Sequence, residues 1–231
     1  MERERPATGE VYHVYNRGVD KRVIFDDDQD RIRFVHDLWE FNDRKPAQYI
    51  DRRVLPDDLS ALMYEVGLPT SKQRRSREKL VDILAWVLMP NHFHLILRPR
   101  VDNGVTIFMR KLGTGYVNAF NLKKDRVGPL FQGVYKFKHI NREAHFLYLP
   151  HYIHLNPIAL TPNGDQKTLL AFLDSYRWSS FQDYCGKTNF PSIIETQFIA
   201  ETFGSKDNYR NELIEWLREG EDAVLGDVLL D

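Results

Sequence analysis

Two apolar segments joined by a two-residue turn constrain the fold of this chain more than any other feature. Val81–Met89 and Phe93–Arg98 are nearly continuous runs of apolar residues, and Pro90 and Asn91 lie between them. Apolar runs of this length around so short a turn predict a β-hairpin. Because few of its residues are polar, we expect the hairpin to lie centrally in a sheet with helices covering one face.

The second strand of this hairpin begins with two histidines. Side chains alternate along a strand, so His92 and His94 share one face while Phe93 points into the core. Two imidazole nitrogens on one face can bind one divalent cation, but a catalytic metal site needs about three protein ligands. The pair is therefore either half of a metal site or simply two half-buried, hydrogen-bonded histidines. The first reading requires a further ligand from elsewhere in the chain.

The other elements complete a β-α-β-β-α-β order. Aspartates at 26–28 can cap a helix that runs to Phe41, and Gly113 and Gly115 weaken but do not exclude the second helix. The remaining predicted elements are strands at Gly9–Asn16 and Leu130–Ile140 and a helix at Gly104–Asn121. This order is the split βαβ of the ferredoxin-like fold, an α+β fold with a four-stranded antiparallel sheet and helices on one face.

Two segments fall outside that order. Residues 43–79 contain three prolines and a basic run, and they predict an insertion with a short helix at Asp57–Tyr64. Beyond residue 186, Glu195–Phe203 and Asp207–Glu219 have the spacing of two amphipathic helices. We therefore expect one domain over residues 1–186 and an acidic helical extension over residues 187–231.

The distribution of charge favours a polyanionic partner for the middle of the chain. The net charge is −1, yet residues 98–143 hold ten basic and three acidic residues, whereas residues 187–231 hold four and ten. The charged start is unlike a signal peptide, and no stretch is long and apolar enough to span a membrane. The single Cys185 excludes a thiolate zinc site and fits a reducing compartment. We therefore expect a cytoplasmic protein without a membrane partner.

A helical segment follows the last predicted strand. Residues 142–155 have helical tendency, and Pro157 places Asn156 at the last turn or just beyond it. Tyr152 and Asn156 are four residues apart, so on a helix a phenol and an amide oxygen share one face. Spacing alone also allows Tyr152 to be a core aromatic residue. It leaves two rival tyrosines open, Tyr148 and Tyr116.

Four motifs, in this order, resemble those of a known enzyme family. They are Tyr12-His-Val-Tyr-Asn-Arg-Gly18, Leu88-Met-Pro-Asn-His-Phe-His-Leu95, Phe131-Gln-Gly-Val-Tyr-Lys136 and Tyr152-Ile-His-Leu-Asn-Pro157. Together they resemble the single-tyrosine HUH transposases of bacterial insertion sequences, and most of all the REP-associated branch, in which Tyr176-Arg-Trp-Ser-Ser180 recurs. The resemblance covers residues 9–186. The long stretch at 43–79 departs from the family pattern.

The resemblance implies an activity and roles for particular residues. His92 and His94 would bind a catalytic Mg²⁺ or Mn²⁺, Asn156 would complete the metal site, and Tyr152 would be the nucleophile. Enzymes of this family nick and rejoin single-stranded or hairpin DNA through a 5′-phosphotyrosine. Both a monomer and a homodimer remain open, because relatives of both kinds exist.

Basic and polar residues near these motifs are candidates for contact with DNA. The uncovered face of a ferredoxin-like sheet can serve as a platform for single-stranded nucleic acid, with lysines along the backbone and aromatic rings against the bases. The candidates are Arg17, Arg98, Arg110, Lys111, Lys136 and Lys138, with His13 and Gln132 as accessory residues. His13 has the simpler alternative of an ordinary strand residue.

Two other functions are compatible with the same residues. One is a domesticated protein that binds hairpin DNA or RNA without catalysis. The other is a metal-dependent phosphodiesterase that uses His92 and His94 but not Tyr152. A covalent adduct between tyrosine and DNA separates the transposase-type reaction from both alternatives.

Overall fold

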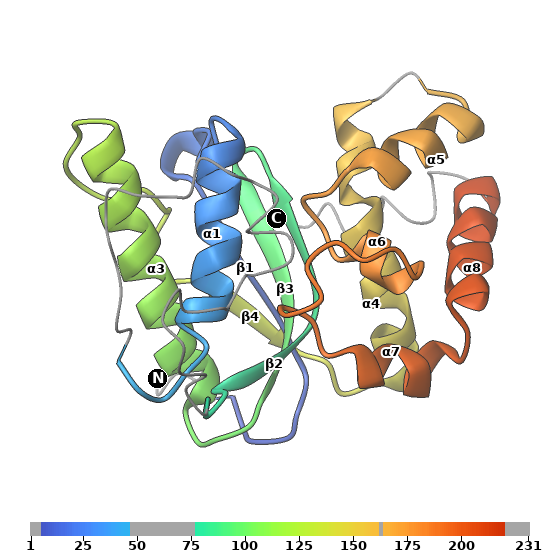
Figure 1. Ribbon diagram of the computed structural model, residues 1–231, viewed down its shortest axis with the longest axis horizontal. Coiled ribbons are helices and arrows are strands. Elements are labelled where there is room, and N and C mark those ends of the chain that lie inside the picture. Colours follow the sequence, from blue (N-terminus) through green and yellow to red (C-terminus); the bar gives the residue numbers. More distant parts are fainter. Residues whose placement is uncertain (1–5, 47–76, 162–163, 220–231) are drawn as a thin grey trace, which may run out of the picture.

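A four-stranded antiparallel sheet lies between two groups of helices in the computed structural model (Figure 1). The structure describes residues 6–46, 77–161 and 164–219. The strand order is β2-β3-β1-β4, with β1 at Tyr12–Arg17, β2 at Val81–Met89, β3 at His92–Pro99 and β4 at Lys136–His139. The prediction of a ferredoxin-like split βαβ fold is confirmed.

The β2–β3 hairpin forms as predicted, but its position in the sheet differs from the prediction. β3 is central, whereas β2 is at the edge of the sheet. The outer edge of β2 is covered by a later segment, because Leu88 N donates to Trp178 O and Ser180 N donates to Trp86 O, at 2.9 and 3.0 Å. An edge strand this apolar needs such a cover, since exposed strand edges promote aggregation. Every residue of β2 is consequently buried.

Helices α1 (Asp28–Glu40) and α3 (Gly104–Lys123) pack on one face of the sheet (Figure 1). The aspartate run caps α1 as predicted, because the Asp27 side chain accepts a hydrogen bond from Asp30 N at 3.0 Å. Gly115 does not break α3. A Cβ at this position would lie 2.3 Å from the Phe41 ring, so the glycine allows α3 to approach α1 closely.

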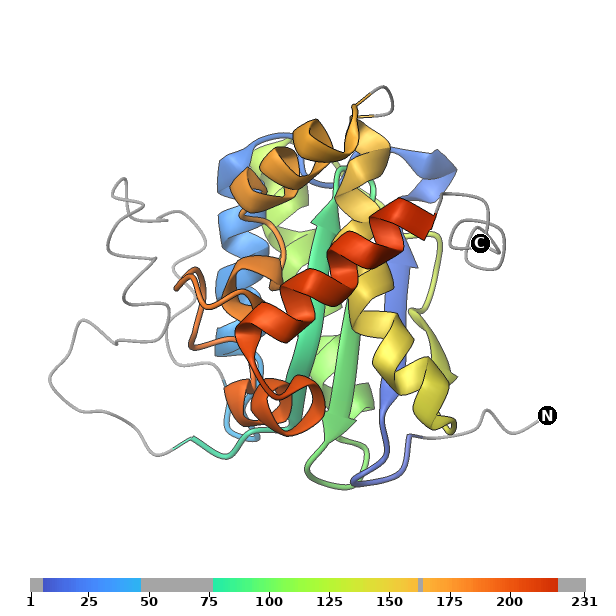
Figure 2. The same ribbon diagram turned by 90° about the vertical axis from the view of Figure 1, so that its right-hand side faces the viewer.

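A second group of helices covers the opposite face along β2 and β3. The group comprises α4 (Glu143–Leu155), η2 (Asn156–Leu160), α5 (Gln166–Ser175), α6 (Phe181–Tyr184), α7 (Thr196–Phe203) and α8 (Lys206–Glu219). Apolar residues of α4, α7 and α8 share a buried cluster with Val87 and Ile96 of the sheet. Figure 2 shows α8 crossing over α4. The platform expected for nucleic acid is therefore limited to the β1 and β4 side.

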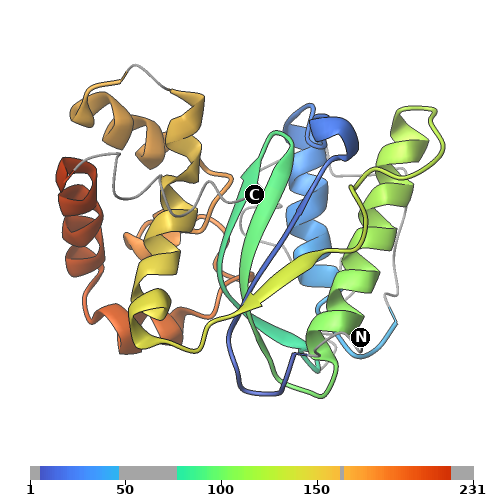
Figure 3. The same cartoon turned by 180° about the vertical axis from the view of Figure 1, so that it is seen from behind.

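The last strand is shorter than predicted. β4 spans only Lys136–His139, pairing with β1, and lies at the far edge of the sheet (Figure 3). Before it, the chain makes an isolated bridge between Phe131 and Gly18 and then leaves the ladder. Gly133 has φ of 145°, a conformation that few residues besides glycine adopt, and this interrupts the strand predicted over residues 130–140.

Two further expectations concern the remaining segments. The helix expected at Asp57–Tyr64 lies outside the described residues. Within the ranges that the structure describes, no helix has the length and apolar character needed to cross a membrane.

Candidate active site

Strand register gathers most of the candidate residues on the sheet face that α4 covers. Tyr15 is paired with His94 on β3 and with Lys136 on β4, and Arg17 is paired with His92. Residues directly opposite one another in neighbouring strands point to the same face. That face therefore carries seven of the predicted site residues on three strands, together with Tyr15; the seven are Arg17, His13, His92, His94, Arg98, Lys136 and Lys138.

The two histidines of β3 are close and differ in burial. Their ring centroids are 5.0 Å apart with the planes at 88°. His94 is 4% exposed, whereas His92 is half-buried at the turn end of the hairpin. His94 Nδ1 lies 2.8 Å from His13 Nε2, and the two rings are stacked. The structure thus brings His13 into direct contact with the predicted metal pair.

The ring of His92 is oriented by Asn91. His92 Nδ1 lies 2.7 Å from Asn91 Oδ1, and Asn91 Nδ2 donates to Lys21 O at 3.1 Å. Because the amide nitrogen is used by the Lys21 carbonyl, the amide oxygen faces the imidazole, and it can only accept a hydrogen bond. His92 Nδ1 therefore donates, and Nε2 of this ring holds the lone pair that a metal needs. Sequence reasoning identified Asn91 only as a turn residue.

Tyr152, on α4, lies beside the rings of His94 and His13. Its ring centroid is 5.8 Å from that of His94 and 6.4 Å from that of His13, edge-on to both. The neighbouring Ile153 is fully buried against the sheet, which fixes the rotation of the helix. One turn on, Asn156 Nδ2 donates to Tyr152 O at 2.9 Å, so Oδ1 is the Asn156 atom suited to a cation.

Of the two rival tyrosines, Tyr116 lies far from the candidate site, whereas Tyr148 lies next to Tyr152. Tyr116 lies in the core between α1 and α3, 1% exposed, and its hydroxyl donates to Ile24 O. Burial raises the pKa of this phenol well above its ordinary value, and Tyr116 lies on the wrong side of the sheet. Tyr148 stacks parallel to Tyr152 at 6.4 Å. A further tyrosine, Tyr15 of β1, lies with its ring centroid 5.7 Å from that of His94.

Burial keeps the inner histidines neutral. Burial first, and then the positive charge of Lys138, lower the pKa of His13 to about 3. The pKa of His94 is also held well below its ordinary value, first by burial and then by His13 and His92. Both rings are therefore neutral at pH 7, which is the form in which an imidazole binds a metal or accepts a hydrogen bond.

Basic residues border the site on its β4 side. Lys136 and Lys138 are exposed on the same face as His13, and Lys136 Nζ lies 5.7 Å from the Tyr15 ring. Arg17 is half-buried and paired with His92, and its buried Nε has no hydrogen-bond partner among the described residues. Gln132 is exposed next to them, and its backbone N–H donates to Arg17 O at 2.9 Å.

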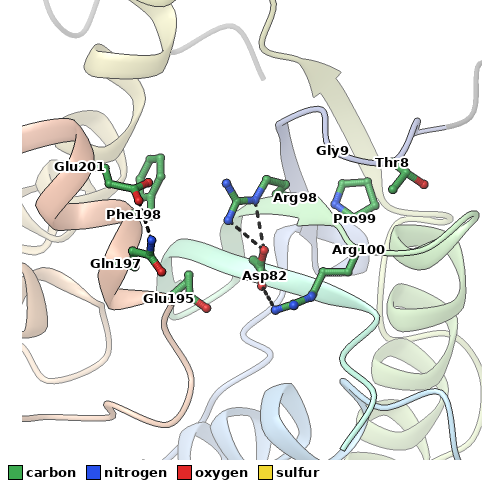
Figure 4. Close-up of a pocket in the computed structure, with 10 residues that line it drawn as sticks. All are labelled: Thr8, Gly9, Asp82, Arg98, Pro99, Arg100, Glu195, Gln197, Phe198 and Glu201. Carbon is green, nitrogen blue, oxygen red and sulfur yellow. Dashed lines mark hydrogen bonds and ion pairs between the residues drawn. The ribbon is translucent and has the colours of Figure 1, made fainter.

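Three predicted DNA-binding residues are not brought to this site. Arg98 is on the same face of β3 but at its other end, where it donates two hydrogen bonds to Asp82 Oδ2 at 3.1 and 3.0 Å (Figure 4). Arg100 completes this ion-pair cluster beside a hollow of about 470 Å³. Arg110 and Lys111 lie on α3, which covers the opposite face of the sheet.

The donor set limits how a metal could be held. Among the described residues, no group of three or more His, Cys, Asp or Glu side chains is arranged to hold a metal ion. His92 and His94 supply two imidazole nitrogens, and Asn156 Oδ1 is the amide oxygen carried by the adjacent helix. Two nitrogens and one oxygen suit a divalent cation such as Mn²⁺, with water or a phosphate oxygen in the open positions.

The fold is similar to that of a solved transposase structure. A REP-associated tyrosine transposase bound to a REP hairpin has 14% sequence identity and a TM-score of 0.51, over 84% of this chain and 90% of that chain. At this identity, the likeness shows a shared fold. No protein-family model and no curated protein matches the sequence. The chain therefore has a fold like that of this tyrosine transposase.

Proposed function

We propose that this protein is a metal-dependent enzyme that nicks and rejoins single-stranded DNA through a covalent tyrosine adduct. The observation that carries the proposal is the position of Tyr152, whose ring lies edge-on to His94 with 5.8 Å between the two centroids. The four motifs resemble those of single-tyrosine HUH transposases, and the fold is like that of a REP-associated tyrosine transposase.

Tyr152 is the proposed nucleophile. Its phenolic oxygen attacks the scissile phosphorus, and the bond from phosphorus to the 3′ oxygen breaks. The products are a 5′-phosphotyrosine and a strand that ends in a 3′-hydroxyl, to which the phenolic proton passes. Because the phosphodiester energy is retained in the adduct, the 3′-hydroxyl of a second strand can reverse the reaction and rejoin DNA without ATP.

His92, His94 and Asn156 are the residues proposed to hold Mg²⁺ or Mn²⁺. The bound cation would polarise a non-bridging oxygen of the scissile phosphate and favour the ionised form of a phenol whose ordinary pKa is near 10. The protein's own contribution is geometric. Strand β3 places the two imidazoles on one face, and α4 places the Tyr152 ring edge-on to His94.

Lys136 and Lys138 are proposed to bind the DNA backbone beside the site. Both are exposed on the edge strand β4, on the face that carries His13 and Tyr15. The REP-associated transposase of similar fold was solved with a REP hairpin bound. We therefore propose hairpin DNA with a single-stranded flank as the substrate, with the flank passing along β4 toward Tyr152.

The test is adduct formation on labelled hairpin DNA with a single-stranded flank in the presence of Mn²⁺, resolved on a denaturing gel. Wild type is expected to give a protein–DNA adduct, and Tyr152→Phe is expected to lose it. Tyr148→Phe and Tyr15→Phe are matched controls, because both rings lie near Tyr152 or His94.

The other outcomes identify which alternative holds. Loss of the adduct in Tyr15→Phe or Tyr148→Phe, but not in Tyr152→Phe, would reassign the nucleophile. Binding without cleavage would indicate a non-catalytic DNA- or RNA-binding protein. Cleavage without any adduct would indicate a phosphodiesterase that uses the histidines alone.

A further inference from the structure

His13 and His94 form a buried pair of imidazoles whose hydrogen bond has two possible directions. The distance from His13 Nε2 to His94 Nδ1 is 2.8 Å, which requires one nitrogen to donate and the other to accept. His13 is 8% exposed and His94 is 4% exposed. Since the contact occupies Nδ1 of His94, only Nε2 of that ring is left to face a metal.

The direction of this hydrogen bond decides whether His94 can be a ligand. If His13 Nε2–H donates, His94 carries its own proton on Nε2, and that nitrogen has no lone pair for a metal. If His94 Nδ1–H donates, His94 Nε2 carries no proton, and its lone pair can bind a metal. The neutral ring of His94 therefore binds a cation only when His13 Nε2 is the acceptor.

His92 shows the same arrangement with a partner whose role is unambiguous. Its Nδ1 donates to Asn91 Oδ1 at 2.7 Å, because the Asn91 amide nitrogen donates to Lys21 O. Nε2 of His92 consequently carries no proton in the neutral ring. Both histidines of the pair thus have Nδ1 engaged by a neighbouring polar group, Asn91 for one and His13 for the other. Such outer partners fix the tautomer and the ring orientation of metal-binding histidines.

We propose that His13 is a positioning residue that accepts the Nδ1–H of His94 and so directs Nε2 of His94 toward the metal. This inference rests on the proposed function, because it assumes that His94 is a metal ligand. His13 acts through His94 and contacts neither substrate nor metal. Its place on β1 is fixed by strand pairing, in which His13 lies opposite Ile96 of β3 and Lys138 of β4.

The tautomer can be measured without metal. In metal-free protein with ¹⁵N-labelled histidine at pH 7, long-range ¹H–¹⁵N spectra distinguish protonated from bare ring nitrogens. We expect His94 to carry its proton on Nδ1 and His13 to have an unprotonated Nε2. The opposite result, with His94 protonated on Nε2, would overturn the inference.

Metal affinity gives a second readout. The full-length protein is titrated with Mn²⁺, and electron paramagnetic resonance measures the Mn²⁺ that stays unbound. The protein should take up Mn²⁺ at a saturable site. His13→Leu removes the acceptor and is expected to weaken binding by roughly 10–100-fold, the range typical for loss of such a partner. His13→Gln places an amide oxygen near the position of Nε2 and is expected to restore most of the affinity.

A matched control separates this effect from general damage to the sheet. His139 is on β4, its ring stacks on Tyr12 at 5.0 Å, and Tyr12 belongs to the core on the other face. His139→Leu should leave Mn²⁺ affinity unchanged. Circular dichroism and the unfolding temperature establish that each variant is folded.

The outcomes separate the two levels of the argument. If wild type binds Mn²⁺ and His13→Leu binds it equally well, the role of His13 is wrong while the proposed function stands. If wild type shows no saturable site, or if His94→Ala binds as well as wild type, the metal-dependent function itself is wrong and the role of His13 falls with it.

Discussion

The two ends of strand β3 carry polar side chains on the same face but in contrasting surroundings. At the first end, the Tyr152 ring lies edge-on to His94, and β1 separates the two histidines of β3 from the exposed lysines of β4. At the other end, roughly 20 Å along the strand, Arg98 is held by Asp82, which also binds Arg100 (Figure 4). One end carries imidazole side chains beside the Tyr152 phenol that is proposed as the nucleophile. The other is an ion-pair cluster whose charges are already matched.

The difference shows that sharing a face does not amount to sharing a function. Alternation along β3 puts His92, His94 and Arg98 on one face with equal certainty. Which of them can bind a ligand depends on the side chains that face them, Tyr152 of α4 at one end and Asp82 of β2 at the other. The following predictions test this contrast, from the largest expected effect to the smallest.

Removing a metal ligand should have the largest effect. His94→Ala is expected to lower nicking of hairpin DNA by at least about 100-fold, because it deletes one of two imidazoles proposed to hold the cation that stabilises charge on the phosphate. The matched change at the other end of β3, Arg98→Gln, should leave the nicking rate within about twofold of the wild-type rate. Single-turnover nicking assays measure both. Equal losses in the two variants would contradict the contrast between the ends.

The helix that carries Tyr152 should give the protein a sensitivity to acid. His151 on α4 stacks on Tyr209 at 4.4 Å, its Nε2–H donates to Glu212 at 3.1 Å, and Phe203 and Trp216 complete its surroundings. Burial lowers the pKa of His151 to about 4. An unfolded histidine titrates near 6.5, so the stability that this residue contributes is present above pH 6.5 and is lost as the pH falls toward 4.

The expected size of that loss is about 2 kcal/mol in the free energy of unfolding between pH 7 and pH 5. His151→Phe keeps an aromatic ring against Tyr209 and should abolish this part of the pH dependence, whereas Glu212→Gln keeps the buried imidazole and should retain most of it. Urea unfolding at the two pH values measures the difference. Unchanged acid sensitivity in His151→Phe would show that this histidine is not the cause.

The ion-pair cluster should contribute to stability and not to catalysis. Asp82 is 5% exposed and accepts hydrogen bonds from both Arg98 and Arg100. Asp82→Asn is expected to lower the free energy of unfolding by roughly 1–2 kcal/mol, since both arginines are partly exposed and water replaces some of the lost interaction. Nicking of hairpin DNA by the folded fraction should be unchanged. A tenfold fall in nicking would place this end of β3 in the active site.

The smallest effects should come from single lysines at the DNA surface. Lys136→Gln and Lys138→Gln are each expected to reduce the slope of log affinity against log salt by about 1, because each removes one phosphate contact. Arg110→Gln, on the opposite side of the sheet, should leave the slope unchanged. Fluorescence anisotropy with a labelled hairpin over a range of salt concentrations measures the slopes. A change in slope for Arg110→Gln would place DNA on the other face.

Local patterns were sufficient for the framework of the site. The period of two placed His92 and His94 on one face, and the spacing of four placed Tyr152 and Asn156 on one side of α4. The predicted length of β4 was wrong because the chain leaves the sheet at Gly133. The alternation of apolar residues does not reveal such a break. The edge position of β2 was missed because a segment about 90 residues later covers that edge.

What the sequence alone determined is therefore what neighbours in the chain decide: the elements, their faces and the four motifs. Only the tertiary structure decided which charges are matched and which histidines touch. Arg98 meets Asp82 across a strand pair, and His13 meets His94 across another. Among the basic residues of the middle segment, Lys136 and Lys138 share the face of His13, whereas Arg110 and Lys111 lie on α3, which covers the other face. These contacts depend on register and packing between distant segments, because hydrogen bonds and ion pairs act over a few ångströms whatever the separation in sequence.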